Sequence, residues 1–283
     1  MGESTGIQWT DATWNPWHGC HKISAGCKNC YMFRDKARFG LDPNIVQRSK
    51  TAFHAPLGWK DPKRIFTCSW SDFFIEEADS WRDEAYWVIR ATPQHTYQIL
   101  TKRPYRIVGR WPEPVLQNVW LGVSVEDQAT ADARIPELLD IPAALRFVSY
   151  EPALGPVDFL NLRQDVAFRA GGRRNVLSGW TDLSGAEPRE HRGLDWVIVG
   201  GESGPNARVF QLQWARDAIE QCRAAGVACF VKQLGAAPAL GLELGAGRLM
   251  EDADPPRLIR LRDPKGGDMT EWEPGLRVRE FPR

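Results

Sequence analysis

Six short apolar runs alternate along the chain with segments of helical spacing, and this alternation limits the fold more than any other feature. The runs are RIFTCS at 64–69, TYQILT at 96–101, VWLGVSV at 119–125, LRFVSY at 145–150, WVIVG at 196–200 and ACFVK at 228–232. Segments 81–89, 129–139 and 212–225, which lie between runs, repeat apolar residues with the period of a helix. Near-continuous apolar strands separated by helices predict an α/β fold with a covered parallel sheet, either doubly wound or closed as a barrel.

Polar side chains follow every one of the six runs. Ligands of such sheets bind beyond the carboxyl ends of the strands. The residues at these ends are Ser69, Ser71 and Asp72, then Thr101, Lys102 and Arg103, then Ser124 and Glu126, then Ser149 and Glu151, then Gly200, Gly201 and Glu202, and finally Lys232 and Gln233. One polar strand end normally just meets solvent, whereas six in succession indicate one shared cavity. We therefore predict a partial or full (β/α) barrel with parallel strands.

Two regions depart from the alternation and define the expected domain organisation. Residues 163–193 are charged and rich in glycine, so we expect an insertion or mobile loop between two strands. Residues 236–283 show little periodicity, so we expect an irregular C-terminal appendage packed on the barrel. The barrel itself is assigned to residues 1–235.

Charge and hydropathy exclude several classes of protein. The 283 residues include 36 Lys and Arg and 36 Asp and Glu, a net charge of zero, which excludes a polybasic nucleic-acid coat. No apolar stretch approaches the roughly 18 residues that span a bilayer, and the first residues lack the apolar segment of a secretory signal. We expect a cytoplasmic protein without a membrane partner.

The first 60 residues carry a modest basic excess, with eight Lys and Arg against four Asp and Glu. Trp9, Trp14 and Trp17 are interleaved with these charges. Basic side chains beside aromatic ones are compatible with nucleic-acid binding, although tryptophans in a chain of this size more often pack in the core.

Three of the six cysteines lie within eleven residues, in the segment WNPWHGCHKISAGCKNCY at 14–31. Their spacing is Cys20-x6-Cys27-x2-Cys30, and a glycine directly precedes each of the first two. Thiolates this close together converge on one soft metal centre, and the glycines allow the chain to turn around it. His18 or His21 could complete a structural zinc site, whereas a [4Fe-4S] cluster held by three thiolates keeps one iron open.

The three-cysteine loop before a β/α barrel, with an aromatic residue after the last cysteine, resembles the radical S-adenosylmethionine superfamily. The wider set of segments, SWSDFF, TKRP, WLGVSVED, FVSYEPALGP, VIVGGESGPNAR, FVKQLG and DPKGGDMTEW, is similar to a phage-associated three-cysteine-motif family. The superfamily resemblance implies a [4Fe-4S] cluster on Cys20, Cys27 and Cys30. Its open iron would chelate the amino and carboxylate groups of S-adenosylmethionine, which an electron would then cleave to methionine and a 5′-deoxyadenosyl radical.

Two departures from the superfamily pattern stand in the sequence. Six residues separate Cys20 from Cys27, where the usual gap is three. A GGE motif that often contacts the amino group of S-adenosylmethionine normally follows the second strand, but here it lies at 200–202, after a late strand. That role is therefore not transferred to these residues.

Two residues are expected to be catalytic. Cys68 ends a strand at the predicted barrel mouth, where it would be a fourth ligand or a hydrogen-atom donor; alternatively it is a small buried apolar residue. Glu202 would contact a ligand, with Gly200 and Gly201 permitting close approach to the backbone, or the motif only forms a tight turn. Cys222 and Cys229 are expected in the core.

The other polar strand ends are expected to bind the cofactor. Lys102 and Arg103 suit a carboxylate or phosphate, or are simply surface cations. Glu126, Glu151 and Asp72 would hold hydroxyl groups, or form structural ion pairs across the rim. The remaining members of this set are Ser69, Thr101, Ser124, Ser149, Gly200, Gly201 and Lys232.

The leading hypothesis is a radical S-adenosylmethionine-type lyase or modifying enzyme, with a [4Fe-4S] cluster and S-adenosylmethionine as cofactors. Its expected substrate is a nucleic acid or nucleotide, most concretely a DNA photolesion under repair, and it would need an electron donor. One alternative is a zinc-stabilised, non-catalytic nucleic-acid-binding protein. Another is an iron–sulfur protein that binds a neighbouring phage or defence protein without radical chemistry.

Overall fold

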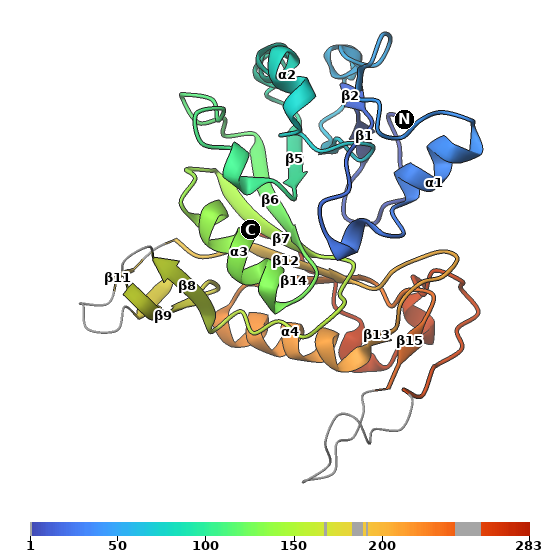
Figure 1. Ribbon diagram of the computed structural model, residues 1–283, viewed down its shortest axis with the longest axis vertical. Helices are drawn as coiled ribbons and strands as arrows, with labels where there is room; N and C mark the ends of the chain where they lie inside the picture. The colour runs from blue at the N-terminus through green and yellow to red at the C-terminus, as the bar shows by residue number, and fades with distance from the viewer. Residues whose placement is uncertain (1, 167–168, 183–188, 191, 241–255) are drawn as a thin grey trace.

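Seven parallel strands form the main sheet of the computed structural model, which describes residues 2–166, 169–182, 189–190, 192–240 and 256–283 (Figure 1). The strands are β1 (Ala12–Trp14), β4 (Arg64–Thr67), β5 (Thr96–Thr101), β6 (Val119–Val125), β7 (Leu145–Tyr150), β12 (Trp196–Gly200) and β14 (Ala228–Gln233). They lie side by side in chain order. A doubly wound sheet would reverse its order at a switch point, so the sheet is a half-barrel and the barrel prediction is confirmed in its partial form.

The predicted strands all form, and the segment upstream of the cysteine loop supplies β1 as an additional first strand. The α-helices of the described residues are α1 (Tyr31–Arg38), α2 (Asp79–Ala91), α3 (Gln128–Leu139) and α4 (Leu212–Ala225). The last three confirm the predicted helical segments. Asp127 begins α3 with a capping box in which its side chain accepts from the backbone N–H of Thr130 at 2.9 Å. Gly226 ends α4 in the left-handed region, with φ 69°.

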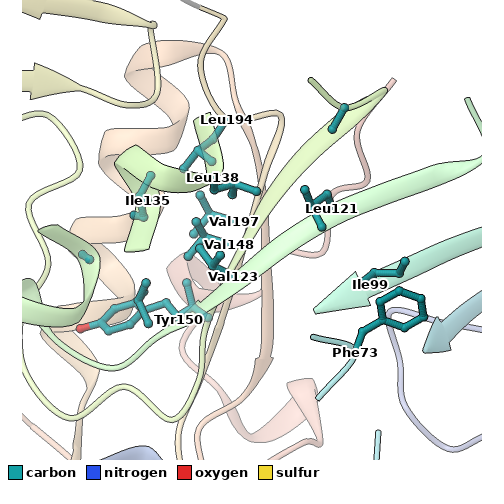
Figure 2. Close-up of a cluster of buried hydrophobic side chains, with 14 of the residues drawn as sticks. Phe73, Ile99, Leu121, Val123, Ile135, Leu138, Val148, Tyr150, Leu194 and Val197 are labelled. Atoms are coloured by element: carbon teal, nitrogen blue, oxygen red, sulfur yellow. The ribbon is translucent and has the colours of Figure 1, made fainter. Parts of the chain in front are cut away.

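One face of the half-barrel packs on the helices. Because side chains alternate along a strand, Val148 of β7 and Val197 of β12 point to the face opposite that of Phe147 and Trp196. Figure 2 shows Ile135 and Leu138 of α3 beside Val123, Val148 and Val197 of the sheet. These residues belong to the larger apolar core.

The concave face is closed at one end by a second apolar cluster dominated by aromatic rings. Its buried members are Trp9, Phe66, Leu145, Phe147, Trp196, Ile198 and Phe230. Trp9 comes from the segment before β1, and its ring lies 4.7 Å from that of Phe66 and 6.3 Å from that of Trp196. The cluster fills the interior below the polar strand ends, and leaves the other end of the half-barrel for a ligand.

Gly122 of β6 makes room for this cluster. A Cβ atom built at Gly122 would lie 2.6 Å from the ring of Phe147. We expect Gly122→Ala to destabilise the fold by about 1–3 kcal/mol, because the ring has to leave its rotamer or the strands must separate. Chemical denaturation should show this loss, whereas Gly58→Ala, where nothing lies within 4 Å, should change the free energy of unfolding by less than about 0.5 kcal/mol. Equal effects at the two positions would contradict this description of the interior.

The segment between β7 and β12, for which the sequence predicts an insertion or mobile loop, forms paired strands in its described part. It is an antiparallel sheet in the order β11-β10-β9-β8, composed of β8 (Leu162–Val166), β9 (Arg169–Asn175), β10 (Trp180–Asp182) and β11 (Arg189–Glu190). Residues 167–168, 183–188 and 191 of the predicted insertion lie outside the described residues. The strands form because glycine and charged residues here pair in register.

Residues 256–283 of the C-terminal segment pack on the barrel, and residues 241–255 of the predicted appendage lie outside the described part. Trp272 and Leu276 are buried in the main core, and Phe281 packs against the ring of Trp196. Phe230 of β14 forms an antiparallel bridge with Arg279, so the tail covers the β14 edge of the sheet.

Shorter elements complete the described chain. The two-residue strands β2 (Trp17–His18) and β3 (Gln47–Arg48) pair with each other, as do β13 (Phe210–Gln211) and β15 (Pro238–Ala239). The 3-10 helices cover Ala25–Cys27, Ala55–Gly58, Glu76–Ala78, Pro104–Arg106, Met269–Glu271 and Pro274–Leu276. None of the helices in the described part of the chain combines the length and apolarity that crossing a bilayer requires.

Candidate functional site

A cavity of about 640 Å³ opens at the carboxyl ends of the parallel strands. This volume is within the range of about 300–1,000 Å³ typical of small-molecule and cofactor sites. The predicted residues that line it are Cys20, Cys27, Cys30, Cys68, Ser69, Asp72, Thr101, Lys102, Ser124, Ser149, Glu151, Gly201, Glu202 and Lys232. The cysteine loop and the polar strand ends therefore line one cavity.

Two of the predicted site residues do not line the cavity. Glu126 is completely buried behind the wall, so it is placed to support the site and not to bind a ligand's hydroxyl groups. Gly200 also lies behind the wall, where an added Cβ would come within 3.2 Å of the carboxyl carbon of Glu151. Its missing side chain makes room for Glu151 and not for a ligand.

The cysteine loop lies between β2 and α1, and its two glycines have different tasks. Gly19 has φ 103°, and an added Cβ would collide with the carbonyl oxygen of Ile45. Gly26 has no such backbone requirement, but an added Cβ would lie 2.5 Å from Oε1 of Glu126. The first glycine allows the turn, and the second allows the loop to lie directly on the barrel wall.

A buried ion pair holds the first cysteine. Asp72 Oδ2 accepts from Arg103 Nη1 at 3.1 Å and from the backbone N–H of Lys102 at 2.9 Å, and both charged side chains are about 6% exposed. Arg103 also donates to the carbonyl oxygen of His21 at 3.0 Å, and its Nη1 lies 3.9 Å from Cys20 Sγ. The strand-end residues Asp72 and Arg103 thus orient Cys20, a role that the sequence did not reveal.

Burial keeps the thiols of Cys20 and Cys30 protonated when no metal binds them. Burial, together with the negative charge of Asp72, raises the pKa of Cys20 to about 12, against the opposing effect of Arg103. Burial also raises the pKa of Cys30. A metal that binds these thiols must therefore displace their protons, and its affinity should rise with pH.

Glu126 holds the cysteine loop on the barrel wall through a hydrogen bond to the loop and ion pairs to the barrel. Its carboxylate accepts from Ser24 Oγ at 2.8 Å and from Arg134 Nη1 at 3.3 Å, and it forms a very close ion pair with Lys102. Burial alone would raise the pKa of Glu126, but the neighbouring Lys102 and Arg134 outweigh it and lower the pKa. The carboxylate is therefore charged, and it connects the loop to the ends of β5 and β6.

Glu202 fastens the same loop from the β12 side. Its Oε2 accepts from Asn29 Nδ2 at 3.0 Å and from Arg208 Nε at 3.0 Å. Arg208 also donates to the carbonyl oxygen of Ala25 at 2.9 Å. Asn29 and Arg208 are site residues that the sequence analysis missed; the position of Asn29 between Cys27 and Cys30 was the available signal for one of them.

The ion pair of Glu202 predicts that the wild type and Glu202→Gln differ in stability, and that the difference depends on pH. Burial raises its pKa, but the bonds from Arg208 and Asn29 together lower it below the usual 4.5. A lowered pKa in the folded state means that the charged carboxylate stabilises the fold above the unfolded pKa, and that this contribution is lost as the pH falls through the lowered value. Glu202→Gln should therefore melt below the wild type at pH 7, and the difference should shrink below pH 4.5. Thermal melts of both proteins across this range measure it; a constant gap would contradict it.

Glu151 and Lys232 form the opposite part of the cavity wall. Lys232 Nζ donates to Glu151 Oε1 at 2.7 Å, and both side chains are about one-fifth exposed. Ser124 and Ser149 lie side by side on adjacent strands below this pair. This wall offers hydroxyl, ammonium and carboxylate groups to a polar ligand.

Cys68 lies at the cavity but is only 2% exposed. It adopts φ 62°, an uncommon left-handed conformation for a non-glycine residue. Burial raises its pKa well above the usual range. Cys222 and Cys229 are buried in the main core, as predicted.

The three thiols of the cysteine loop line the cavity. A zinc ion and a four-iron cluster require different arrangements of such thiols. Among the described residues, no three His, Cys, Asp or Glu side chains form a group suited to one metal ion. His18 does not line the cavity, whereas His21 lines it and its Nε2 lies 2.5 Å from Glu77 Oε1, which leaves Nδ1 for a metal. A four-iron cluster takes each thiolate on a different iron, so its ligands need not converge on one point. The three thiols at the cavity are the kind of donor set that such a cluster takes.

The comparisons with known proteins give a family and no activity. Neither the curated proteins nor the solved structures include a significant match. A family model described as "Protein of unknown function (DUF5131)" matches residues 4–255. Since this match spans nearly the whole chain, the protein belongs to the DUF5131 family.

Proposed function

We propose that the protein is a radical S-adenosylmethionine-type enzyme with a [4Fe-4S] cluster on Cys20, Cys27 and Cys30. The observation that carries the proposal is the single cavity at the mouth of a parallel half-barrel, into which these three cysteines and the polar strand ends come together. When bound, the cluster supplies the electron for the reductive cleavage of S-adenosylmethionine to methionine and a 5′-deoxyadenosyl radical.

The chain's own residues would bind and orient the second cofactor. Glu151 and Lys232 offer one carboxylate and one ammonium group on the wall, which suit the charged amino and carboxylate groups or the ribose hydroxyls of S-adenosylmethionine. The aromatic cluster that closes the interior keeps water from the far end of the cavity. Cys68 lies at the cavity beside Ser69, where it would return a hydrogen atom to a substrate radical.

The substrate is proposed as a nucleic acid or nucleotide, and DNA photolesion repair is its most concrete form. One argument for it is wrong: Trp9, Trp14 and Trp17 are all 2% exposed or less, so they pack in the core and cannot stack on bases. The charged cavity wall and the resemblance to the radical S-adenosylmethionine superfamily support this class of substrate.

Reductive cleavage of S-adenosylmethionine tests the proposal directly. Protein purified and reconstituted without oxygen, then reduced with dithionite, should convert S-adenosylmethionine to 5′-deoxyadenosine and methionine, as measured by chromatography. Cys30→Ala should abolish the product, while Cys222→Ala should retain it. Failure of the loaded wild-type protein to cleave S-adenosylmethionine, with or without added oligonucleotides, would overturn the proposed chemistry.

A further inference from the structure

One turn of the C-terminal tail, DPKGGD at 263–268, reaches the wall of the cavity. Lys265 of this turn lines the cavity, and so does Gln8 from the segment before β1. Both residues are also exposed to solvent. The tail therefore contributes to the site, in addition to covering the edge of the sheet.

The turn fixes the backbone of Lys265. Asp263 Oδ1 accepts from the backbone N–H of Lys265 at 3.0 Å. The carbonyl oxygen of Gly266 accepts from the backbone N–H of Leu234, directly after β14, at 2.8 Å. Gly266 has φ 63°, and an added Cβ would lie 2.5 Å from the carbonyl oxygen of Gly235, so a glycine is required here. A ligand therefore meets a lysine whose backbone is already ordered, and only its side chain has to be fixed on binding.

The charge of Lys265 distinguishes it from the other cations of the cavity wall. The Lys and Arg residues that line the cavity are Arg34, Lys102, Arg103, Lys232 and Lys265. The first four each form an ion pair with a carboxylate of the described residues. Among those same residues, Lys265 has neither an ion pair nor a hydrogen-bond partner for its side chain. Its ammonium group, with its full charge and all its donors, is therefore available to an anion.

The turn lies on the open side of the half-barrel. β1 and β14 are the two edges of the main sheet, and they do not pair with each other in the described chain. The turn is bonded to the chain directly after β14, whereas Gln8 lies shortly before β1. A Cβ atom added at Gly267 would lie 3.8 Å from Nε2 of Gln8, so the two segments meet on this side. A ligand that extends out of the cavity here passes Lys265 and Gln8.

We propose that Lys265 binds a phosphate group of the substrate, and that Gln8 is a second hydrogen-bond donor to the same group. The inference rests on the proposed function, because it concerns the nucleotide or nucleic-acid substrate of that cavity. The charge of the ammonium group and that of the phosphate make this contact stronger than a neutral hydrogen bond. Every nucleotide unit brings a phosphate, so a lysine at this place positions the substrate without reading its sequence.

The carboxylate of S-adenosylmethionine is the other anion expected in the cavity, but it suits Lys265 less well. An amino group lies beside that carboxylate, so this end of the cofactor bears both charges. The ion pair of Glu151 and Lys232 also offers both charges. A cation without an ion pair suits a group that bears negative charge alone, as a phosphodiester does.

Calorimetric titration of cluster-loaded, full-length protein, kept oxidised and free of oxygen gas, tests the phosphate site. The probes are the thymidine dinucleotide with its natural phosphodiester and the same dinucleotide with a neutral methylphosphonate in its place. At low salt the wild type should bind the charged probe about tenfold more tightly than the neutral one. Lys265→Gln should remove this preference and leave the affinity for the neutral probe unchanged, while Lys265→Arg should keep most of the preference.

Lys60→Gln is the matched control, because Lys60 is exposed before β4 and does not line the cavity. It should show the same preference as the wild type. A preference that survives in Lys265→Gln would overturn the proposal, and so would a wild type that binds both probes equally or binds neither.

S-adenosylmethionine serves as the third probe and should bind Lys265→Gln and the wild type equally. A weaker affinity of the variant for S-adenosylmethionine, with the preference between the dinucleotides unchanged, would assign Lys265 to the cofactor's carboxylate and contradict the phosphate site. If the protein takes up no cluster or does not cleave S-adenosylmethionine, the proposed chemistry fails. Titration of that same protein with the two dinucleotides still decides whether Lys265 binds a phosphate.

Discussion

Cys27→Ala is expected to abolish cluster binding, with the loss of essentially all iron and of the broad visible absorbance. Cys27 is buried at the cavity, on the short 3-10 helix Ala25–Cys27 that places it between the two other thiols. With only two thiolates left on the loop, two irons of the cluster would lack a protein ligand. Iron analysis and absorption spectra of reconstituted protein measure this loss.

Cys222→Ala provides the matched control for that result. Cys222 is also buried, but it lies in α4 and packs in the main core. Its replacement should cost about 1 kcal/mol of stability through lost packing and leave the iron content unchanged. If Cys27→Ala kept its iron, or if both variants lost it equally, the assignment of ligands to the loop would be wrong.

Glu126→Gln is expected to destabilise the protein by about 3–5 kcal/mol, since it leaves the buried cation of Arg134 and the partly buried cation of Lys102 without their carboxylate. Glu126 is fully buried and is also the acceptor for Ser24 of the cysteine loop. Denaturant unfolding measures this loss. Limited proteolysis should also cleave the cysteine loop of the variant more easily, because the hydrogen bond that holds the loop to the barrel is weakened.

Glu220→Gln is the matched control, because Glu220 is exposed on α4 and its change should stay within about 0.5 kcal/mol. A Glu126→Gln protein as stable as this control would show that the carboxylate does not hold the loop.

Most of the fold could be predicted because the sequence patterns that indicate it are local. The apolar runs and the helical spacing each need only a few neighbouring residues, and chain order then fixed the order of the strands. The antiparallel insertion escaped prediction because its strands contain glycine and arginine, whose pairing depends on partners across the hairpin. The burial of Trp9 agrees with the more common place of tryptophan in the core.

The sequence predicted which residues lie at the cavity, but not what each of them does there. That polar strand ends and cysteines share a cavity follows from parallel topology alone. Which carboxylate faces the cavity and which supports the loop depends on partners distant in the chain: Ser24 is 102 residues from Glu126, and Asn29 is 173 residues from Glu202. Such pairings carry no pattern in the sequence, so Glu126 was expected either to bind a ligand or to form a structural ion pair, and the structure shows the ion pair.

The metal content of protein isolated without oxygen tests the central claim most directly. Iron, acid-labile sulfide and zinc are measured together with the absorption spectrum, on the wild type and on the variant in which Cys20, Cys27 and Cys30 are all replaced by alanine. A [4Fe-4S] cluster predicts about four iron and four sulfide per chain, with broad absorbance in the visible blue, and none of these in the variant. One zinc per chain, without iron or sulfide after reconstitution, would contradict it.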